Sequence, residues 1–244
     1  MRLTVLGTGG GWARRDGAAS GYLLQEDGFN VWLEAGTGTM ANLQRHLDLL
    51  DIHAVIVSHQ HFDHFLDLYP YFLSRQYGRT EVPPPLPLYA PPGMLDHARS
   101  LEPELGNAFD LTEVVPGEDF AVGPFTVRTA PMVHPVPTLG MRFETDGVAF
   151  AYSADTAPTE GLDRVARGAD VLLSEATWLE PRPQAPPMHM TAAEAGERAT
   201  AAGARRLVLT HIWPTLDLGE MVHRASEAFD GPVEAAVEGM RVDL

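Results

Sequence analysis

The stretch "SHQHFDH", residues 58–64, places three histidines and one aspartate within six positions. An unpaired imidazole is costly to bury, and three protonated imidazoles at close range would repel one another. The chain contains no cysteine, so any bound metal must be held by nitrogen and oxygen ligands. The cluster therefore indicates a bound metal cation, and the fold must hold these residues around it.

Three more ligand-type residues follow stretches with strand composition. His134 follows "FTVRTAPMV", Asp155 follows "VAFAYS" and His211 follows "RLVLT", just as the cluster follows "DIHAVIVS". Side chains at strand ends are held by a rigid scaffold and can converge on one site. Five imidazoles and two carboxylates suit two divalent ions when one carboxylate bridges, and such ions lie about 3.5–4 Å apart. The candidate ligands are His59, His61, Asp63, His64, His134, Asp155 and His211.

Strand composition predicts β-strands at 3–7, 21–26 and 29–34, the last two joined by a hairpin turn at Asp27 and Gly28. Helical spacing predicts helices over 39–50, 64–78 with a kink near Pro70, 93–103 and 217–229. Residues 190–204 predict another helix, with a capping box formed by Thr191 and Glu194.

In the remaining stretches, strand composition predicts a short edge strand at 87–90 and two strands joined by a second Asp-Gly turn at Asp146 and Gly147. Further strands are expected at 125–133, 171–178 and 206–212, and one final strand over 231–244. No composition break divides the chain, so we expect one domain over residues 1–244 with two packed sheets.

Composition sets limits on function. With 45% hydrophobic residues over 244 positions, the chain can build a sizeable core. A net charge of −16 should repel long nucleic acid. No apolar run approaches the roughly 18 residues that a membrane span needs, so no membrane partner is expected. The sequence opens directly on a strand-like segment without a signal-peptide pattern, and we expect a cytoplasmic protein.

Two other segments have ordinary interpretations. The glycine loop "GTGGG" lacks the residues of a P-loop or a dinucleotide fingerprint, and indicates tight backbone near the site. The proline-rich residues 82–93 predict a loop, with a polyproline ligand as the alternative. The remaining histidines, His46, His53, His97 and His223, are expected at the surface.

The signature H-x-H-x-D-H in "SHQHFDH" resembles that of the metallo-β-lactamase superfamily, and "MVHP", "YSADT" and "LTHI" follow in the same order. This resemblance implies an α/β fold, a four-layer αββα sandwich with a dinuclear site at one edge. It implies that His59, His61 and His134 hold one ion, that Asp63, His64 and His211 hold the other, and that Asp155 bridges. Zinc is the expected metal, with manganese as the alternative.

A narrower resemblance points to the ribonuclease Z-like branch. "SEATW" and "MHMTAAEAG" look like the stretch that places a glutamate and a histidine beside the metals, here Glu175 and His189. Without the resemblance, His189 reads as a surface residue before a helix. The tRNA-processing members carry a long arm between the third and fourth motifs, whereas only the 20 residues 135–154 separate His134 from Asp155 here.

The whole pattern is similar to small bacterial atypical cyclic-nucleotide phosphodiesterases, notably in "ASGYLL", "LTHI" and "AFDGPVEAAV". One departure is Ala154, where the branch often has glycine. The resemblance implies a metal-dependent phosphodiesterase acting on a small phosphodiester, with a 3',5'-cyclic nucleotide as the leading substrate, and a homodimer.

In that mechanism Asp63 orients or deprotonates water, His189 serves the leaving oxygen and Glu175 holds the His189 tautomer. Hydrolysis of a carboxylic ester, lactone or thioester at the same site is the alternative, and tRNA 3'-end processing is a weaker one. A binding role would require the metal site to have decayed, but every ligand is present. His61 stands where superfamily members with redox chemistry usually place a carboxylate, which favours hydrolysis.

Overall fold

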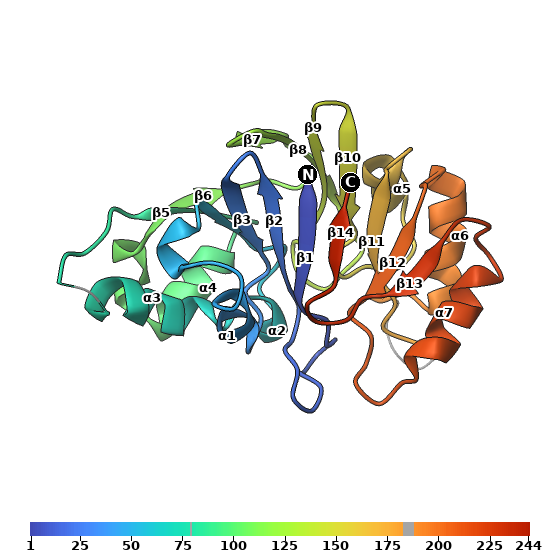
Figure 1. The fold of residues 1–244 in the computed structure, drawn as a ribbon, viewed down its shortest axis with the longest axis horizontal. Helices are drawn as coiled ribbons and strands as arrows, with labels where there is room; N and C mark the ends of the chain where they lie inside the picture. The colour runs from blue at the N-terminus through green and yellow to red at the C-terminus, as the bar shows by residue number, and fades with distance from the viewer. Residues whose placement is uncertain (79, 183–187) are drawn as a thin grey trace.

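Two seven-stranded sheets pack face to face in the computed structural model, with helices on both outer faces (Figure 1). The structure describes residues 1–78, 80–182 and 188–244. The sheet orders are β14-β1-β2-β3-β4-β5-β6 and β13-β12-β11-β10-β9-β8-β7. This arrangement confirms the predicted four-layer αββα sandwich. Among the described residues, no helix is long and apolar enough to cross a membrane.

The first sheet carries four helices on its outer face. Its strands are β1 Arg2–Gly7, β2 Gly21–Glu26, β3 Phe29–Leu33, β4 Ala54–Ile56, β5 Leu86–Ala90, β6 Phe109–Glu113 and β14 Arg241–Asp243. The helices are α1 Thr39–Leu43, α2 Phe62–Phe65, α3 Leu68–Tyr77 and α4 Met94–Leu101. Asp27 and Gly28 both have positive φ, as a tight hairpin turn requires, and they join β2 to β3 as predicted.

The second sheet carries three helices. Its strands are β7 Phe120–Val122, β8 Phe125–Pro131, β9 Leu139–Thr145, β10 Val148–Tyr152, β11 Val171–Glu175, β12 Leu207–Thr210 and β13 Val233–Ala235. The helices are α5 Glu160–Ala166, α6 Ala192–Ala202 and α7 Leu218–Ser226. The predicted Asp146–Gly147 turn joins β9 to β10, and the predicted capping box of Thr191 and Glu194 begins α6.

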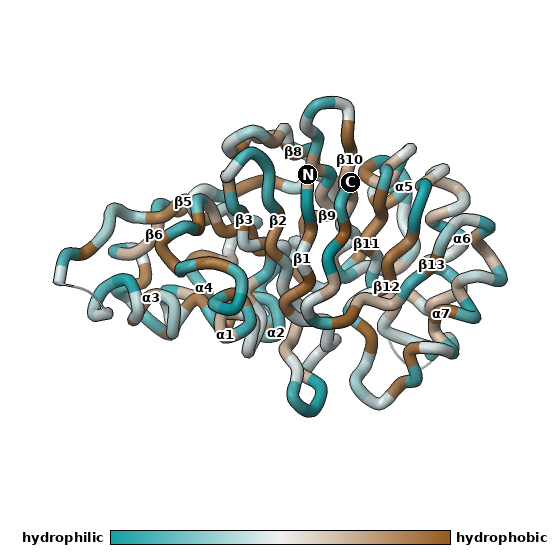
Figure 2. The backbone as a smooth tube through the Cα atoms, in the orientation of Figure 1, coloured by the Kyte–Doolittle hydropathy of each residue, from teal (hydrophilic) through white to brown (hydrophobic). Residues whose placement is uncertain are grey.

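Each of the three interfaces between layers has its own apolar core. Large side chains such as Tyr22, Phe143 and Phe150 fill the space between the sheets. Trp32 and Phe65 lie in the core between the first sheet and its helices, whereas small alanines dominate the core under α6. Figure 2 shows hydrophobic residues along the strands of both sheets. These apolar runs occur because both faces of each sheet are buried. The same burial holds the strands rigidly, including the strand ends that precede the residues of the site.

Four predicted elements differ from the structure. The helix expected over 39–50 stops at Leu43, and a 3-10 turn, Leu49–Asp51, follows. The helix expected over 64–78 is divided into α2 and α3 before Pro70, which lies in the first turn of α3, where its missing N–H is tolerated. The strand expected at the edge, β5, is interior because β6 pairs with it. The expected final strand is two strands, β13 and β14, in different sheets.

Candidate metal centre

Four strands deliver the candidate ligands at their C-terminal ends, as the sequence predicts. The 59–64 cluster follows β4 of the first sheet, while His134, Asp155 and His211 follow β8, β10 and β12 of the second. The structure brings all seven residues together in two groups, each with ligand atoms within 4.8 Å of one another. The first group is His59, His61, His134 and Asp155, and the second is Asp63, His64 and His211.

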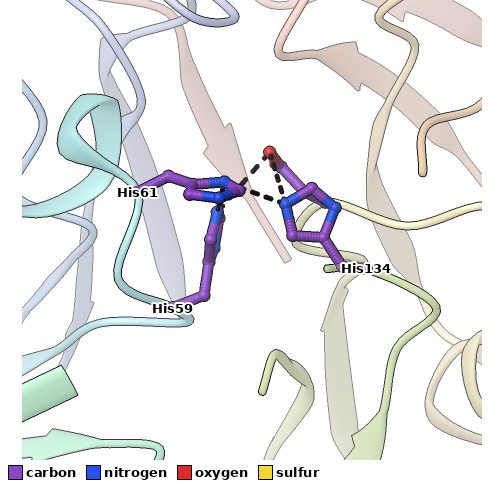
Figure 3. A group of neighbouring side chains, drawn as sticks. His59, His61 and His134 are labelled. Atoms are coloured by element: carbon purple, nitrogen blue, oxygen red, sulfur yellow. Dashed lines mark hydrogen bonds and ion pairs between the residues drawn. The ribbon is translucent and has the colours of Figure 1, made fainter. Parts of the chain in front are cut away.

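Three imidazoles converge in the first group (Figure 3). His61 Nδ1 lies 3.1 Å from His59 Nε2 and 2.9 Å from His134 Nε2. Asp155 Oδ2 completes the group at 3.6 Å from His59 Nε2 and 3.9 Å from His134 Nε2. A tetrahedral ion with bonds of about 2.0–2.1 Å to nitrogen would separate its ligand atoms by about 3.3 Å. The four atoms therefore have nearly the spacing of a tetrahedral shell.

Asp155 lies between the two groups. Its Oδ1 is 3.5 Å from His64 Nε2, and its Oδ2 is 3.3 Å from His211 Nε2. Asp63 Oδ2 lies 3.1 Å from His211 Nε2 and 3.4 Å from His64 Nε2. One carboxylate thus faces imidazoles of both groups, which is the arrangement that a bridging ligand needs.

Two buried atoms that lie 3.5 Å apart across the two groups support metal binding. Within the described part of the chain, neither His64 Nε2 nor Asp155 Oδ1 has a hydrogen-bond partner, although both are fully buried. Leaving such atoms unsatisfied costs about 1–3 kcal/mol each, and more for a charged group. A cation between them would satisfy both, so the residues present fit divalent metal ions.

Hydrogen bonds on the outer side orient four of the imidazoles. Each uses Nδ1 for a second partner and leaves Nε2 facing the cluster, which fixes its tautomer and ring direction. The pairs are His59 with Ser58 Oγ at 2.9 Å, His64 with Glu34 Oε2 at 2.8 Å, His134 with the Met188 carbonyl at 3.0 Å and His211 with Thr177 Oγ1 at 2.9 Å. His61 is the exception, because its Nδ1 faces the cluster.

Sequence reasoning missed Glu34 and Thr177. Glu34 is fully buried, has a positive φ of 63° and also accepts a hydrogen bond from the Ser58 backbone N–H. A carboxylate directly after the buried strand "FNVWL" was the available signal, because an unpaired buried acid needs a partner. Thr177 lies inside the quoted "SEATW", but its contact with His211, 34 residues away in the sequence, is a tertiary one.

Glu175 and His189 lie beside the cluster. His189 Nδ1 is 3.0 Å from Glu175 Oε1 and 3.9 Å from Asp155 Oδ2, and 13% of its side chain is exposed. Glu175 is fully buried and accepts hydrogen bonds from the backbone N–H groups of Thr156 and Met190 and from Thr177 Oγ1. The carboxylate therefore fixes His189 from one side and leaves Nε2 for another partner.

Histidines of the site differ in the direction in which their surroundings shift the pKa. Burial lowers the pKa of His59 well below its ordinary value, and lowers the pKa of His134 to about 4. Burial also lowers the pKa of His189, but Glu175 and Asp155 outweigh it and raise that pKa to about 9. The neutral imidazoles of His59 and His134 suit metal ligation, whereas His189 favours a protonated imidazole.

The glycine loop lies against the second group. The Gly11 N–H donates to Asp63 Oδ2 at 2.8 Å. A Cβ on Gly10 would lie 2.5 Å from the His211 carbonyl oxygen and 2.9 Å from His211 Nδ1. The expectation of tight backbone near the site is confirmed, because no side chain larger than hydrogen fits there without displacing a candidate ligand.

A four-layer sandwich with a histidine–aspartate cluster at its strand ends defines a class of metal-dependent hydrolases. Residues 29–212 match the family described as "Beta-lactamase superfamily domain", and the chain belongs to this superfamily. An uncharacterized protein of Mycobacterium leprae (strain TN) is 35% identical over 253 residues, covering 100% of this chain and 89% of the relative.

Further relatives place the chain more narrowly. The crystal structure of the metallo-β-lactamase fold protein YhfI from Bacillus subtilis has a TM-score of 0.91, 27% identity, and covers 99% of this chain and 98% of that one. A ribonuclease Z of Mycobacterium bovis is 28% identical over 275 residues, covering 100% of this chain and 98% of the relative. The chain is a metal-dependent hydrolase of the metallo-β-lactamase superfamily and is similar to ribonuclease Z proteins, which confirms the expected superfamily and enzyme class.

Proposed function

We propose that this protein is a dinuclear metal-dependent phosphodiesterase for a small phosphodiester, with a 3',5'-cyclic nucleotide as the leading substrate. The observation that carries the proposal is the position of His189. The imidazole lies beside the candidate ligands, with Nδ1 3.9 Å from Asp155 Oδ2, and the buried Glu175 carboxylate holds Nδ1. A protonated imidazole in this position is suited to donate its other proton to an alkoxide as it leaves phosphorus. A sugar oxygen is a poor leaving group without such a proton.

The proposed ligands follow the two groups of the site. His59, His61 and His134 would hold one ion, Asp63, His64 and His211 would hold the second, and Asp155 would contribute to both. Two bound divalent ions supply a nucleophile from water and stabilise negative charge on the phosphoryl group. We propose zinc in both positions, with manganese as the alternative.

The protein's own residues then have separate tasks. The Asp63 carboxylate, which accepts a hydrogen bond from the Gly11 N–H, orients the attacking water and accepts its proton. His189 donates a proton from Nε2 to the leaving oxygen. Glu175 accepts the hydrogen bond from His189 Nδ1, which keeps the ring oriented and favours its protonated form.

A small substrate is favoured by charge and by the length of one connection. The net charge of −16 opposes a polyanion more strongly than a mononucleotide. The ribonuclease Z alignment spans 275 positions, more than the 244 residues of this chain, so that relative has residues for which this chain has no counterpart. Between His134 and Asp155 this chain has only the β9–β10 hairpin, with no room for a tRNA-binding arm.

An activity screen with excess zinc or manganese tests the proposal. The panel contains 3',5'-cyclic nucleotides, linear phosphodiesters, lactones, thioesters and a precursor tRNA, with Asp63→Ala purified in parallel to expose contaminating activity. We expect the highest kcat/KM for a cyclic nucleotide. Preferred hydrolysis of lactones or thioesters would replace the proposal with the ester-hydrolase alternative. Cleavage of precursor tRNA at a rate rivalling a cyclic nucleotide would contradict the small-substrate assignment.

A further inference from the structure

Three of the four tryptophans in the chain lie in loops beside the metal centre. Trp12 follows Gly11, whose N–H holds Asp63; Trp178 follows Thr177; and Trp213 comes two residues after His211. The fourth, Trp32, is buried in the core under β3. The three loop indoles therefore do not belong to the apolar cores of the sandwich. Because they lie next to residues that hold the candidate ligands, we expect them to have a role at the site.

The three indoles form a continuous row that begins at His189. The ring centroid of Trp178 lies 5.8 Å from that of His189 and 4.3 Å from that of Trp213. Trp213 in turn lies 5.2 Å from Trp12. The Arg182 guanidinium lies over this row, 3.9 Å from the Trp178 centroid and 4.4 Å from the Trp213 centroid. The planar guanidinium of Arg182 thus covers Trp178 and Trp213, whereas Trp12 is 45% exposed.

Hydrogen bonds hold the row in place before any ligand binds. The Arg14 guanidinium donates to the backbone carbonyls of Trp213, Pro214 and Leu216 at 3.3–3.4 Å, which ties the loop of Trp12 to the loop of Trp213. The Trp178 backbone N–H donates to the Met190 carbonyl, next to His189. A pre-organised aromatic surface loses little entropy when a flat ligand stacks on it.

We infer that Trp12, Trp178 and Trp213 form an aromatic subsite that binds the base of a nucleotide substrate, with Trp12 as its open stacking face. The inference deepens the proposed function and rests on it for the phosphate chemistry. Every nucleobase has a flat π-face, and stacking on an aromatic side chain contributes about 1–3 kcal/mol per base. Trp178 contacts His189, and Trp12 directly follows Gly11, whose N–H donates to Asp63 Oδ2, so both ends of the row adjoin residues of the metal centre. A base stacked on the row could therefore remain covalently linked to the phosphate being cleaved.

Kinetics with and without the base test the subsite. For Trp12→Ala we expect KM for a cyclic nucleotide to rise about 5- to 100-fold, the fold-change equivalent of stacking energy, with kcat within about twofold of wild type. Trp12→Phe should recover most of the loss. Ribofuranose 3',5'-cyclic phosphate, which lacks the base, should be hydrolysed equally by wild type and Trp12→Ala. Tyr77→Ala removes an exposed ring at the C-terminal end of α3, outside the tryptophan row, and serves as the matched control.

Equilibrium binding separates this inference from the proposed function. Adenosine 5'-monophosphate should quench tryptophan fluorescence of the wild type and of Tyr77→Ala, and much less that of Trp12→Ala. Quenching without hydrolysis of any phosphodiester would keep the subsite and reject the phosphodiesterase. An equal rise in KM for the cyclic phosphates with and without base, or a Trp12→Ala enzyme within twofold of wild type for both, would overturn the subsite.

Discussion

The imidazole of His189 has surroundings suited to proton transfer. Burial opposes its charge, but Glu175 at 3.0 Å and the nearby Asp155 outweigh that cost and raise the pKa to about 9. In the metal-free protein the ring therefore holds a proton on both nitrogens near neutral pH, with Nδ1 directed to Glu175. A general acid with this pKa stays charged until the pH rises toward 9, so the acid form is lost on the alkaline side.

We predict that His189→Ala retains metal but loses about 10²- to 10⁴-fold in kcat for a cyclic nucleotide. The loss should be much smaller for a nitrophenyl phosphodiester, because a nitrophenolate leaves without a proton. Glu175→Gln should show the same pattern more mildly. Metal analysis and steady-state kinetics with both substrates provide the readout. Equal losses on the two substrates would indicate a role in phosphate positioning, and turnover within about twofold of wild type would remove His189 from the mechanism.

Backbone strain also concentrates in this site. Ala154 and His211, next to or within the ligand set, have φ values of 51° and 50°, in the left-handed region. For a residue other than glycine this conformation costs about 1–2 kcal/mol. The Ala154 side chain is fully buried, and its backbone has a conformation that glycine would adopt without this cost. Such strain is typical where the surrounding structure dictates the direction of a functional side chain.

At the scale of elements, the loop after β1 positions the second ligand group. Gly10 lies against the carbonyl oxygen and Nδ1 of His211, and Thr177, two residues after β11, forms a hydrogen bond with the same Nδ1. The loops following β1, β11 and β12 therefore act together on one ligand. Helix α6 begins at its capping box, whose N-cap residue Thr191 comes two residues after His189. The capping box therefore fixes the backbone next to His189, the proposed general acid.

We predict that Gly10→Ala lowers the affinity of the second ion by about 10- to 100-fold, the range for lost orientation of a ligand. The added Cβ would lie 2.9 Å from His211 Nδ1 and must displace that ring. Gly106→Ala is the matched control, because its Cβ would meet only the Arg99 side chain at 3.6 Å or more. Titration with zinc under competition from a chelator measures both. Unchanged affinity in Gly10→Ala would show that the loop does not position His211.

At the scale of the whole molecule, the metal centre joins the two sheets. His59, His61, Asp63 and His64 come from the first sheet, and His134, Asp155 and His211 from the second. A bound ion would therefore link layers that otherwise contact each other through the apolar core between them. Binding to the folded chain alone stabilises it by mass action, by about 2.7 kcal/mol at a concentration 100 times the dissociation constant.

We predict about two bound divalent ions per chain and a rise in Tm of about 5–10 °C for each ion loaded at that ratio, since 1 kcal/mol corresponds to about 2–4 °C for a chain of this size. Asp155→Ala should lower the occupancy of both positions, because this carboxylate faces imidazoles of both groups. Elemental analysis and thermal melts measure the two effects. A preparation that holds one ion or none under excess zinc or manganese would refute the dinuclear assignment.

The sequence alone determined the seven candidate ligands, since short-range patterns carry this information, and the resemblance of its motifs to a known superfamily implied the family and the sandwich. Ligand residues directly follow apolar strands, and the Asp-Gly turns and the capping box depend on neighbouring residues. The predictions from sequence were wrong where local patterns do not determine the position of an element in the fold. "PLYA" has the same composition at an edge or inside a sheet, and only pairing with β6 makes β5 interior.

Only the tertiary structure decided which residues support the ligands. Glu34 and its partner His64 are 30 residues apart in the sequence, and Thr177 and its partner His211 are 34 apart. A local sequence pattern therefore cannot identify either pair of partners. The row of Trp12, Trp178 and Trp213 likewise comes from three separate loops. Sequence periodicity reports the face on which a residue lies, whereas the direction of a loop side chain is set by the packing of distant segments around it.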